Sequence, residues 1–265
     1  MRRILLALVA LVLLARPLAV SADQYGDFTY TNDGSAISIT GYTGAGGAVV
    51  MPGVIDGVPV TSFEFQVFGN RPNVTSVTIP STVLSIPSWG FAFCSNLTTV
   101  VIPNGLTNIG SGAFVHCNNL TSLAFPASLT NIPHRSFDYC VKLLGIFMQG
   151  NAKTDDVFLF SSCTNATVYY LPGTTGWTNT FGGRPAVLWN PLVQTDDGSL
   201  GMGTNGFGFN ITGTTNIPIV VEAAPDVVGG HWVPLLTNTI ATGSVYFSDP
   251  DWTNRPARFY RIRSP

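Results

Sequence analysis

Apolar positions recur with one constant spacing through the middle of the chain. Phenylalanine keeps this spacing five times, cysteine four times and isoleucine three times. The positions are Phe68, Phe91, Phe114, Phe137 and Phe160; Cys94, Cys117, Cys140 and Cys163; and Ile86, Ile109 and Ile132. Five phenylalanines in one register are very improbable by chance, so the segment is an array of similar structural units.

Each unit contains one short apolar segment with a fixed internal pattern. In one unit it reads Leu97-x-x-Val100-x-Ile102, and Pro103 follows directly. Proline ends a strand because it lacks the N–H that a ladder needs. The same three-residue apolar pattern begins at Val74, Leu120 and Leu143. It predicts one short parallel strand in each unit.

A single unit cannot bury its own apolar side chains. Stacking the units about 4.8 Å apart pairs their strands in parallel and aligns like side chains in columns. The pattern therefore predicts a mainly β solenoid of about five 23-residue coils, with parallel strands and short helical turns. In such a solenoid the phenylalanine and cysteine columns form a structural ladder in the core.

The segments outside the repeat divide the rest of the chain. Residues 23–50 contain alternating apolar positions around Asn32-Asp33-Gly34, which predict a capping hairpin before the solenoid of residues 51–172. Residues 173–205 are rich in Gly, Thr and Asn, and we expect a linker or degenerate cap there. Residues 206–265 hold short apolar runs about ten residues apart, which predict a small antiparallel β-sandwich-like domain.

Residues 1–22 predict a Sec-type signal peptide. Arg2 and Arg3 precede an apolar run over residues 4–14, and the small residues Val20-Ser21-Ala22 form a cleavage site. The apolar run is shorter than the roughly 20 residues that span a bilayer. We expect cleavage after about Ala22, no transmembrane segment afterwards, and a location outside the cell or at the cell envelope.

The repeat resembles a known family. Residues 112–126 carry the pattern Gly-Ala-Phe-x-x-Cys-x-x-Leu with a closing proline, which resembles the BspA-type leucine-rich repeat family over about residues 51–172. The resemblance implies a bacterial surface or secreted protein that acts in adhesion or protein binding. Residues 232–235, 246–250 and 258–261 resemble a C-terminal module of exported proteins from Verrucomicrobia-like bacteria, which implies little about activity.

Charge and composition exclude several classes of partner. Only 10% of the residues are charged, against about 25% in a typical soluble protein. Removing the signal segment with its three arginines changes the formal charge from −2 to −5. Nucleic acids and anionic lipids both require a basic patch. We therefore expect neither class of partner.

The four cysteines allow three interpretations. An even number of cysteines in an exported chain is compatible with disulfides. Stacked side chains, however, keep their Cβ atoms about 4.8 Å apart, wider than the ~3.8 Å of a disulfide. Zinc needs close pairs of ligands rather than one thiol per unit. A buried ladder of free thiols is the preferred interpretation, disulfides are the alternative, and no metal is expected.

Catalytic chemistry has no recognisable motif in this sequence. The histidines are not grouped: His116 and His134 occupy different positions of the repeat, and His231 lies in the C-terminal segment. No nucleophile elbow, zinc-binding His-Glu-x-x-His or phosphate loop occurs. The acidic pairs at residues 155–156 and 196–197 lack the alternation of a calcium loop. We expect a non-enzymatic protein without a cofactor.

Two surfaces of the solenoid are candidates for partner binding. One is the strand face between the core positions, and the other is an aromatic column two residues after the ladder phenylalanines. The expected binding residues are Phe93, His116 and Tyr139 in the column with Trp89 nearby, and Thr99, Val101 and Phe147 on the strand face. Exposed aromatic groups mark interaction sites, although these rings can also stack on each other as surface rungs.

The preferred function is protein–protein interaction or adhesion at the cell surface. A glycan-binding envelope protein and a passive structural spacer are the alternatives. The sequence identifies neither the protein ligand nor the oligomeric state, and it leaves the role of the C-terminal module open.

Overall fold

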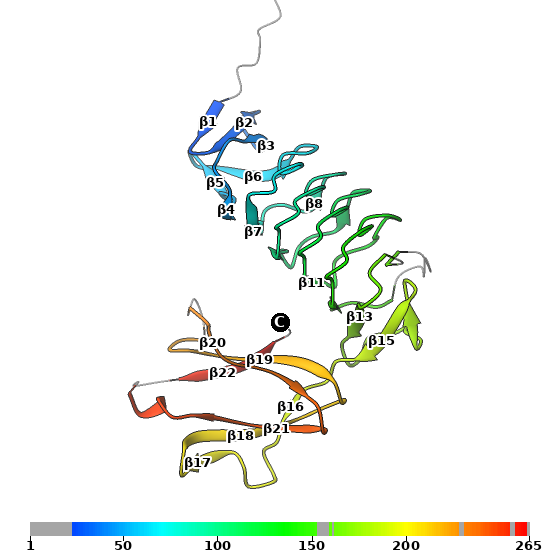
Figure 1. Ribbon diagram of the computed structural model, residues 1–265. Helices are drawn as coiled ribbons and strands as arrows, with labels where there is room; N and C mark the ends of the chain where they lie inside the picture. Colours follow the sequence, from blue (N-terminus) through cyan, green and yellow to red (C-terminus); the bar gives the residue numbers. More distant parts are fainter. Residues whose placement is uncertain (1–22, 153–158, 161, 228–230, 255–257, 264–265) are drawn as a thin grey trace, which may run out of the picture.

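The chain folds into a β-solenoid followed by a module of two antiparallel sheets (Figure 1). The computed structural model describes residues 23–152, 159–160, 162–227, 231–254 and 258–263, so the expected signal peptide lies outside the described residues. Among those residues the helical content is one short 3-10 helix, Trp252–Asn254. The prediction of a mainly β fold with a parallel solenoid is confirmed.

An antiparallel hairpin covers the start of the solenoid. Strand β2 (Phe28–Asn32) pairs with β3 (Ile37–Tyr42) around the turn at residues 33–36, and β1 (Asp23–Tyr25) pairs with the outer side of β2. Strand β3 then pairs in parallel with β6 (Val58–Phe63), which also pairs with β5 (Val54–Ile55). The hairpin is therefore joined to the first coil by continuous strand pairing.

Parallel strands form one face of the solenoid, called the strand face below. Their order is β4 (Gly47–Val50), β7 (Val74–Thr78) and β9 (Thr99–Val101), then β11 (Ser122–Phe125), β12 (Gly145–Met148), β13 (Thr167–Tyr170) and β15 (Arg184–Leu188). On another side of the coils, β8 (Ser85–Ile86) pairs with β10 (Asn108–Ile109). The repeat predicts the strands from β7 to β13. The strand face has one more strand at each end, β4 before them and β15 after them.

The segment expected to be a linker or degenerate cap, residues 173–205, consists partly of solenoid. Strand β15 pairs in parallel with β13 and antiparallel with β14 (Thr180–Phe181), so these strands close the last coil. Strands β16 (Leu192–Val193) and β17 (Gly201–Gly203) both pair with β18 (Gly206–Thr212) and belong to the C-terminal module. The Gly, Thr and Asn residues lie in the turns between these short strands.

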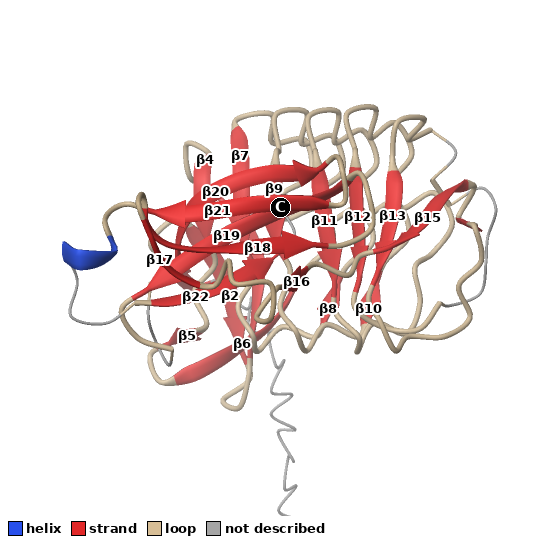
Figure 2. Ribbon diagram, turned by 90° about the horizontal axis from the view of Figure 1, so that it is seen from below, coloured by secondary structure: helices blue, strands red, loops and turns tan. Residues whose placement is uncertain are grey.

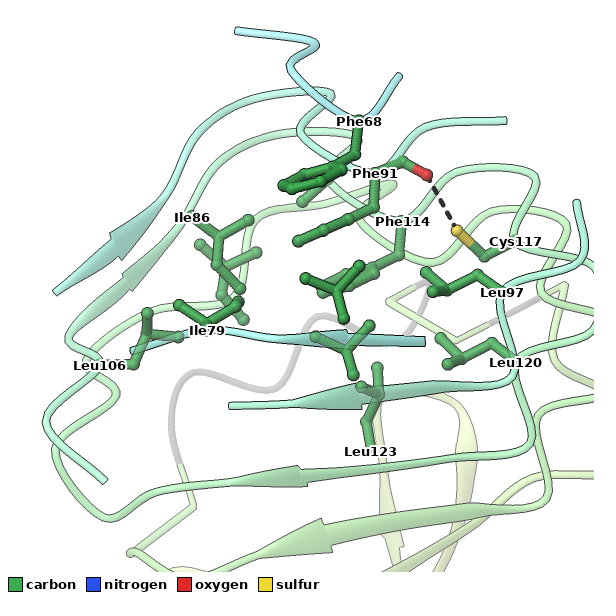
Figure 3. Packing of buried hydrophobic residues seen from close by; sticks show 14 of the residues in the cluster. Phe68, Ile79, Ile86, Phe91, Leu97, Leu106, Phe114, Cys117, Leu120 and Leu123 are labelled. Atoms are coloured by element: carbon green, nitrogen blue, oxygen red, sulfur yellow. Dashed lines mark hydrogen bonds between the residues drawn. The ribbon is translucent and has the colours of Figure 1, made fainter. Parts of the chain in front are cut away.

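Like side chains lie on top of one another in the solenoid core (Figure 3). The ring centroids of Phe68, Phe91, Phe114 and Phe137 follow at 5.3, 5.4 and 5.5 Å with tilts of only 8–12°, and Phe160 follows at 5.2 Å. All five side chains are fully buried. Burial of one such side chain stabilises a protein by about 1.5–3 kcal/mol, so the column is a major source of stability.

The four cysteine thiols join neighbouring coils by hydrogen bonds. All four are free and buried. Cys117 Sγ donates to the carbonyl oxygen of Phe91 at 3.1 Å (Figure 3), and Cys94 Sγ donates to that of Phe68 at 2.9 Å. Cys140 and Cys163 make the equivalent bonds one and two coils further. Burial raises the pKa of Cys94 to about 11, so the thiols are neutral donors.

Tight turns rather than helices complete the coils. Their backbone hydrogen bonds link an N–H to the carbonyl three residues earlier, as from Ala92 to Trp89 at 3.1 Å and from Cys94 to Phe91 at 3.2 Å. Each turn ends after one or two such bonds. The short helical turns expected from the sequence are therefore isolated turns.

The C-terminal module consists of two antiparallel sheets that share one core. The first contains β16, β17, β18 and β21 (Ser244–Asp249), and the second contains β19 (Ile217–Ala224), β20 (Val233–Ile240) and β22 (Phe259–Arg263). Phe209, Ile211, Ile219, Val221 and Phe247 are buried between them. The prediction of antiparallel sheets in this part of the chain is confirmed.

The C-terminal module lies over the strand face of the solenoid. Figure 2 shows its strands crossing those of the solenoid at a steep angle, and Figure 1 shows the two parts meeting near β13 and β15. Trp189 fixes this contact, because its indole Nε1 donates to the carbonyl oxygen of Pro218 at 2.8 Å. Its ring also meets Phe147 edge-on at 6.3 Å.

Candidate functional site

An aromatic column runs along the turns of the solenoid. The ring of His116 lies between Phe93 at 4.8 Å and Tyr139 at 4.3 Å, nearly parallel to both. Trp89 lies 6.2 Å from Phe93. The exposed fraction is 38% for Trp89 and Phe93 and 53% for Tyr139. The structure therefore brings together, at the surface, all four residues that the sequence placed in or near this column.

The residues of the aromatic column all have a left-handed backbone. The φ angles of Trp89, Phe93, His116 and Tyr139 lie between 58° and 63°. The same turn positions in neighbouring coils hold Asn70 and Gly112, also at positive φ. Gly adopts this conformation without cost and Asn more easily than other residues, whereas it costs an aromatic residue about 1–3 kcal/mol. The turn thus requires the backbone shape but does not require a ring.

Stacking offsets part of this backbone cost. An aromatic pair contributes about 0.5–1.5 kcal/mol beyond its burial, and the column contains three successive contacts. Because the rings of Phe93, His116 and Tyr139 lie face to face, their edges rather than their faces point outward. The column presents a narrow apolar stripe along the solenoid.

The strand face holds the other predicted binding residues in two environments. Thr99 and Val101 are exposed, with 51% of Val101 accessible. Phe147 is only 5% exposed and stacks on Tyr169 at 4.9 Å. Phe147 therefore differs from the expectation that it faces a partner, because the C-terminal module covers this end of the strand face.

Two pockets lie between the strand face and the C-terminal module. One has a volume of about 280 Å³ and is lined by Ser122, Phe147, Tyr169, Pro218 and Thr239, among others. The second has about 210 Å³ and includes Trp189 and Arg263 in its lining. No local pattern in the sequence predicts this site, because strands from two distant parts of the chain form it.

A group of ion pairs lies in the β19–β22 part of the module. Glu222 is 4% exposed and accepts hydrogen bonds from Arg261 Nε at 2.8 Å and Arg263 Nε at 2.6 Å. Burial opposes ionisation of this carboxyl, but the hydrogen bonds and charges of both arginines outweigh it and hold the pKa of Glu222 below its ordinary value. The carboxylate is therefore ionised at neutral pH.

The histidines lie in separate parts of the structure. His116 lies in the aromatic column, while His231 lines a pocket of the C-terminal module together with Asp251 and Arg258. No cluster of three or more His, Cys, Asp or Glu side chains among the described residues is placed to hold a metal ion. No helix in the described ranges is long and apolar enough to cross a membrane. The acidic pair at residues 155–156 lies outside them.

Comparison with known proteins identifies the repeat. Residues 61–180 match six copies of the BspA type leucine rich repeat region, one more coil than the sequence pattern predicts. The match covers the coils with the aromatic column and most of the strand face, and it ends before the C-terminal module begins. No curated protein matches the chain.

Several solved structures are similar to the chain. A leucine rich repeat protein of T. pallidum is 26% identical over 58% of this chain and 87% of that one, with a TM-score of 0.44. A leucine-rich repeat protein from Bacteroides capillosus is 29% identical over 48% of this chain and 98% of its own, with a TM-score of 0.42. A leucine rich cell surface protein from Faecalibacterium prausnitzii is 22% identical, covering 73% and 59% of the two chains, with a TM-score of 0.41.

Proposed function

We propose that this chain is an exported, non-enzymatic surface protein that binds a protein partner through the aromatic column. The observation that carries the proposal is the choice of residues at the left-handed turn positions. Phe93 and Tyr139 stand, partly exposed, where Asn70 shows that a small polar residue also fits the turn. Exposed aromatic groups are enriched at the energetic centres of protein interfaces.

The repeat architecture supports this function. Solenoids present long, regular surfaces for interaction because each coil adds one equivalent set of side chains. The BspA type repeats of residues 61–180 supply the coils that carry the column. Together with the predicted signal peptide, this arrangement favours display of the column outside the cell.

The stacking geometry favours a protein partner over a glycan. A sugar ring packs best on an open aromatic face, and the faces of His116 are covered by Phe93 and Tyr139. The exposed ring edges instead form an apolar stripe that a complementary protein surface can cover. A glycan ligand or a passive spacer role would be alternative outcomes of the following test.

The test replaces Phe93 and Tyr139 by Asn in one double variant. Purified protein is assayed by interferometry against an array of extracellular-matrix proteins, envelope proteins and polysaccharides. We expect at least a tenfold loss of affinity for the protein that the original chain binds. The melting temperature should change by no more than a few degrees, because Asn relieves the backbone cost while the stacking is lost.

A matched control separates the column from general surface apolarity. Leu84 is 51% exposed and directly precedes β8, away from the column. Leu84→Asn removes a similar apolar group and should leave binding unchanged. Equal binding by the double variant and the original chain would refute the proposed role of the column, and binding to polysaccharides alone would favour the glycan alternative.

A further inference from the structure

The C-terminal module covers one end of the strand face and leaves the other end exposed. Trp189 and Pro218 hold the two walls together at the C-terminal coils, where the 280 Å³ and 210 Å³ pockets lie. Toward the N-terminal coils the strand face is uncovered, since Val101 is 51% and Val50 is 69% exposed. Figure 1 shows the module diverging from β7 and β4 in this direction. The two pockets and the exposed strand face of the N-terminal coils beside them are together called the cleft below.

The solenoid wall of this cleft is flat and uncharged. Paired strands place like positions side by side, with Ser76 next to Thr99 and Thr78 next to Val101. The side chains that point away from the core are therefore small hydroxyl and aliphatic groups. Such a wall suits the close approach of an extended backbone and offers no charge of its own.

The opposite wall carries a small excess of positive charge. Arg261 and Arg263 project from the same side of β22, two residues apart, and their side chains are 47% and 42% exposed. Both bind the single carboxylate of Glu222, so these three groups together carry a formal charge of +1. Arg263 lines the pocket beside Trp189, which places this charge inside the cleft.

Two further observations mark these arginines as a prepared site. The guanidinium carbon of Arg261 lies 4.3 Å from the centre of the Trp232 ring, so a cation–π contact fixes its orientation. In the sequence, four of the twelve lysines and arginines fall at Arg255, Arg258, Arg261 and Arg263. Arg258 is paired with Asp249 at 2.8 Å, so the positive charge that remains for a ligand is that of Arg261 and Arg263 beside Glu222.

The ring geometry in the cleft distinguishes between anionic ligands. Phe147 and Tyr169 cover each other's faces at 4.9 Å, and Trp189 meets Phe147 edge-on. A sugar ring packs best on an open aromatic face, which this pair does not offer, whereas a peptide can use the extended strand face and a partner for its carboxylates. Arginine binds carboxylates through two parallel hydrogen bonds.

We propose that this cleft binds an extended peptide segment that carries acidic side chains. The carboxylates pair with Arg261 and Arg263, and the peptide backbone lies along the strand face of the N-terminal coils. The cleft is separate from the aromatic column, and this site does not depend on the function assigned to the column.

The first experiment measures peptide binding to the full chain. The probe is a fluorescent ten-residue peptide of alternating Glu and Thr, compared with peptides in which Gln or Lys replaces Glu. Fluorescence anisotropy should show that the Glu peptide binds at least tenfold more tightly than the Gln peptide, and that the Lys peptide does not bind. The affinity should fall as the salt concentration rises, because exposed charges are screened.

The second experiment changes one charge in the cleft. Arg261→Gln should weaken binding of the Glu peptide roughly tenfold, the scale of one charged hydrogen bond. Arg263 remains to neutralise Glu222, so the module should still fold. Arg135→Gln removes the same charge from an exposed position on a solenoid turn and should have no effect.

A variant on the solenoid wall keeps the proposal testable if Arg261→Gln does not fold. Val101→Glu adds a negative charge at an exposed position and should also weaken binding, whereas Leu84→Glu outside the cleft should not. Equal affinity for the Glu and Gln peptides, or unchanged binding in both cleft variants, would overturn the proposal. So would a preference for polygalacturonate over the Glu peptide. Replacement of Phe93 and Tyr139 by Asn should leave peptide binding intact, which distinguishes the two sites.

Discussion

The solenoid and the C-terminal module are stabilised by different kinds of contact. In the solenoid, uncharged side chains contact equivalent side chains in the adjacent coil. Phe91 stacks on Phe114, and the Thr98 hydroxyl donates to the Thr75 carbonyl at 2.9 Å. In the module, the contacts join different side chains and do not repeat, as in the ion pair between Arg258 and Asp249 at 2.8 Å. Repetition makes the solenoid tolerant of low charge, whereas the module depends on a few specific pairs.

This difference follows from how the two parts of the chain bury polar groups. A stacked coil satisfies its backbone and hydroxyl groups through the next coil, so it needs few charges. The central strand β19 of the module buries Glu222, and a buried carboxylate costs free energy unless charged donors surround it. The two parts should therefore respond differently to mutation and to pH.

The largest expected effect is the loss of one ring from the phenylalanine column. Phe114→Ala removes a fully buried side chain that contacts rings on both sides, and it should lower the free energy of unfolding by about 3–5 kcal/mol. Urea denaturation followed by circular dichroism measures this change. Phe93→Ala, at a 38% exposed position, is the control and should cost far less. A loss below about 1 kcal/mol for Phe114→Ala would contradict the stacked core.

Alkaline pH should weaken the solenoid before it affects the module. Burial raises the pKa of Cys94 from 9.0 to about 11 and that of Cys163 to about 12. Between pH 9 and these raised values, a thiol is deprotonated in the unfolded chain but still protonated in the folded chain. The free energy of unfolding therefore falls as pH rises. At about 1.4 kcal/mol for each pKa unit, Cys94 alone accounts for roughly 2–3 kcal/mol at pH 11.

Hydrogen exchange resolved by segment tests this order of unfolding. Protection of β7, β9 and β11 should decrease between pH 9 and 10 while that of β19 is retained, because the partly buried tyrosine of the module, Tyr260, titrates only at or above its ordinary pKa of 10.0 in either state. Cys94→Ala should make the stability of the solenoid less dependent on pH in this range. An identical pH dependence in both parts of the chain would contradict the assignment.

The smallest of the three effects concerns acid and the module. The arginines hold the pKa of Glu222 below its ordinary value, so its contribution is present above the normal carboxylate range and is lost as pH falls through the lowered value. Glu222→Gln should reduce stability at pH 7 by about 1–2 kcal/mol and make acid unfolding of the module less steep. Asp196→Asn, at an exposed loop position, should do neither, and equal effects of the two variants would argue against the ion pairs.

The sequence predicts the inner coils well because one spacing governs them. Val77 pairs with Val100 and Leu123 with Ile146, and each pair is separated by one repeat of the chain. The end coils depart from this spacing, which explains why the pattern missed them. Val49 and Val77, which pair at the first coils, are further apart in the sequence than one repeat, whereas Tyr169 and Val187 at the last coil are closer together. Insertions and deletions in the turns hide such coils without disturbing the stack.

The candidate sites were predictable to different degrees. Stacking on a common period places Phe93, His116 and Tyr139 in one column, so the sequence suffices to bring them together. The cleft could not be foreseen, because the contact of Trp189 with Pro218 joins two aperiodic segments. The burial of Phe147 has the same origin, since the docked module covers it but leaves exposed Val101, which holds the same position two coils earlier in the strand face.

The regular spacing of the aromatic column has a consequence for how such proteins diversify. Phe93, His116 and Tyr139 each belong to a different coil, so duplication of one of these repeats in the gene lengthens the exposed stripe by one ring. Such an event inserts a coil between the hairpin and the last coils and leaves the Trp189 contact untouched. The length of the aromatic column can therefore change between related chains while the residues of the cleft stay the same.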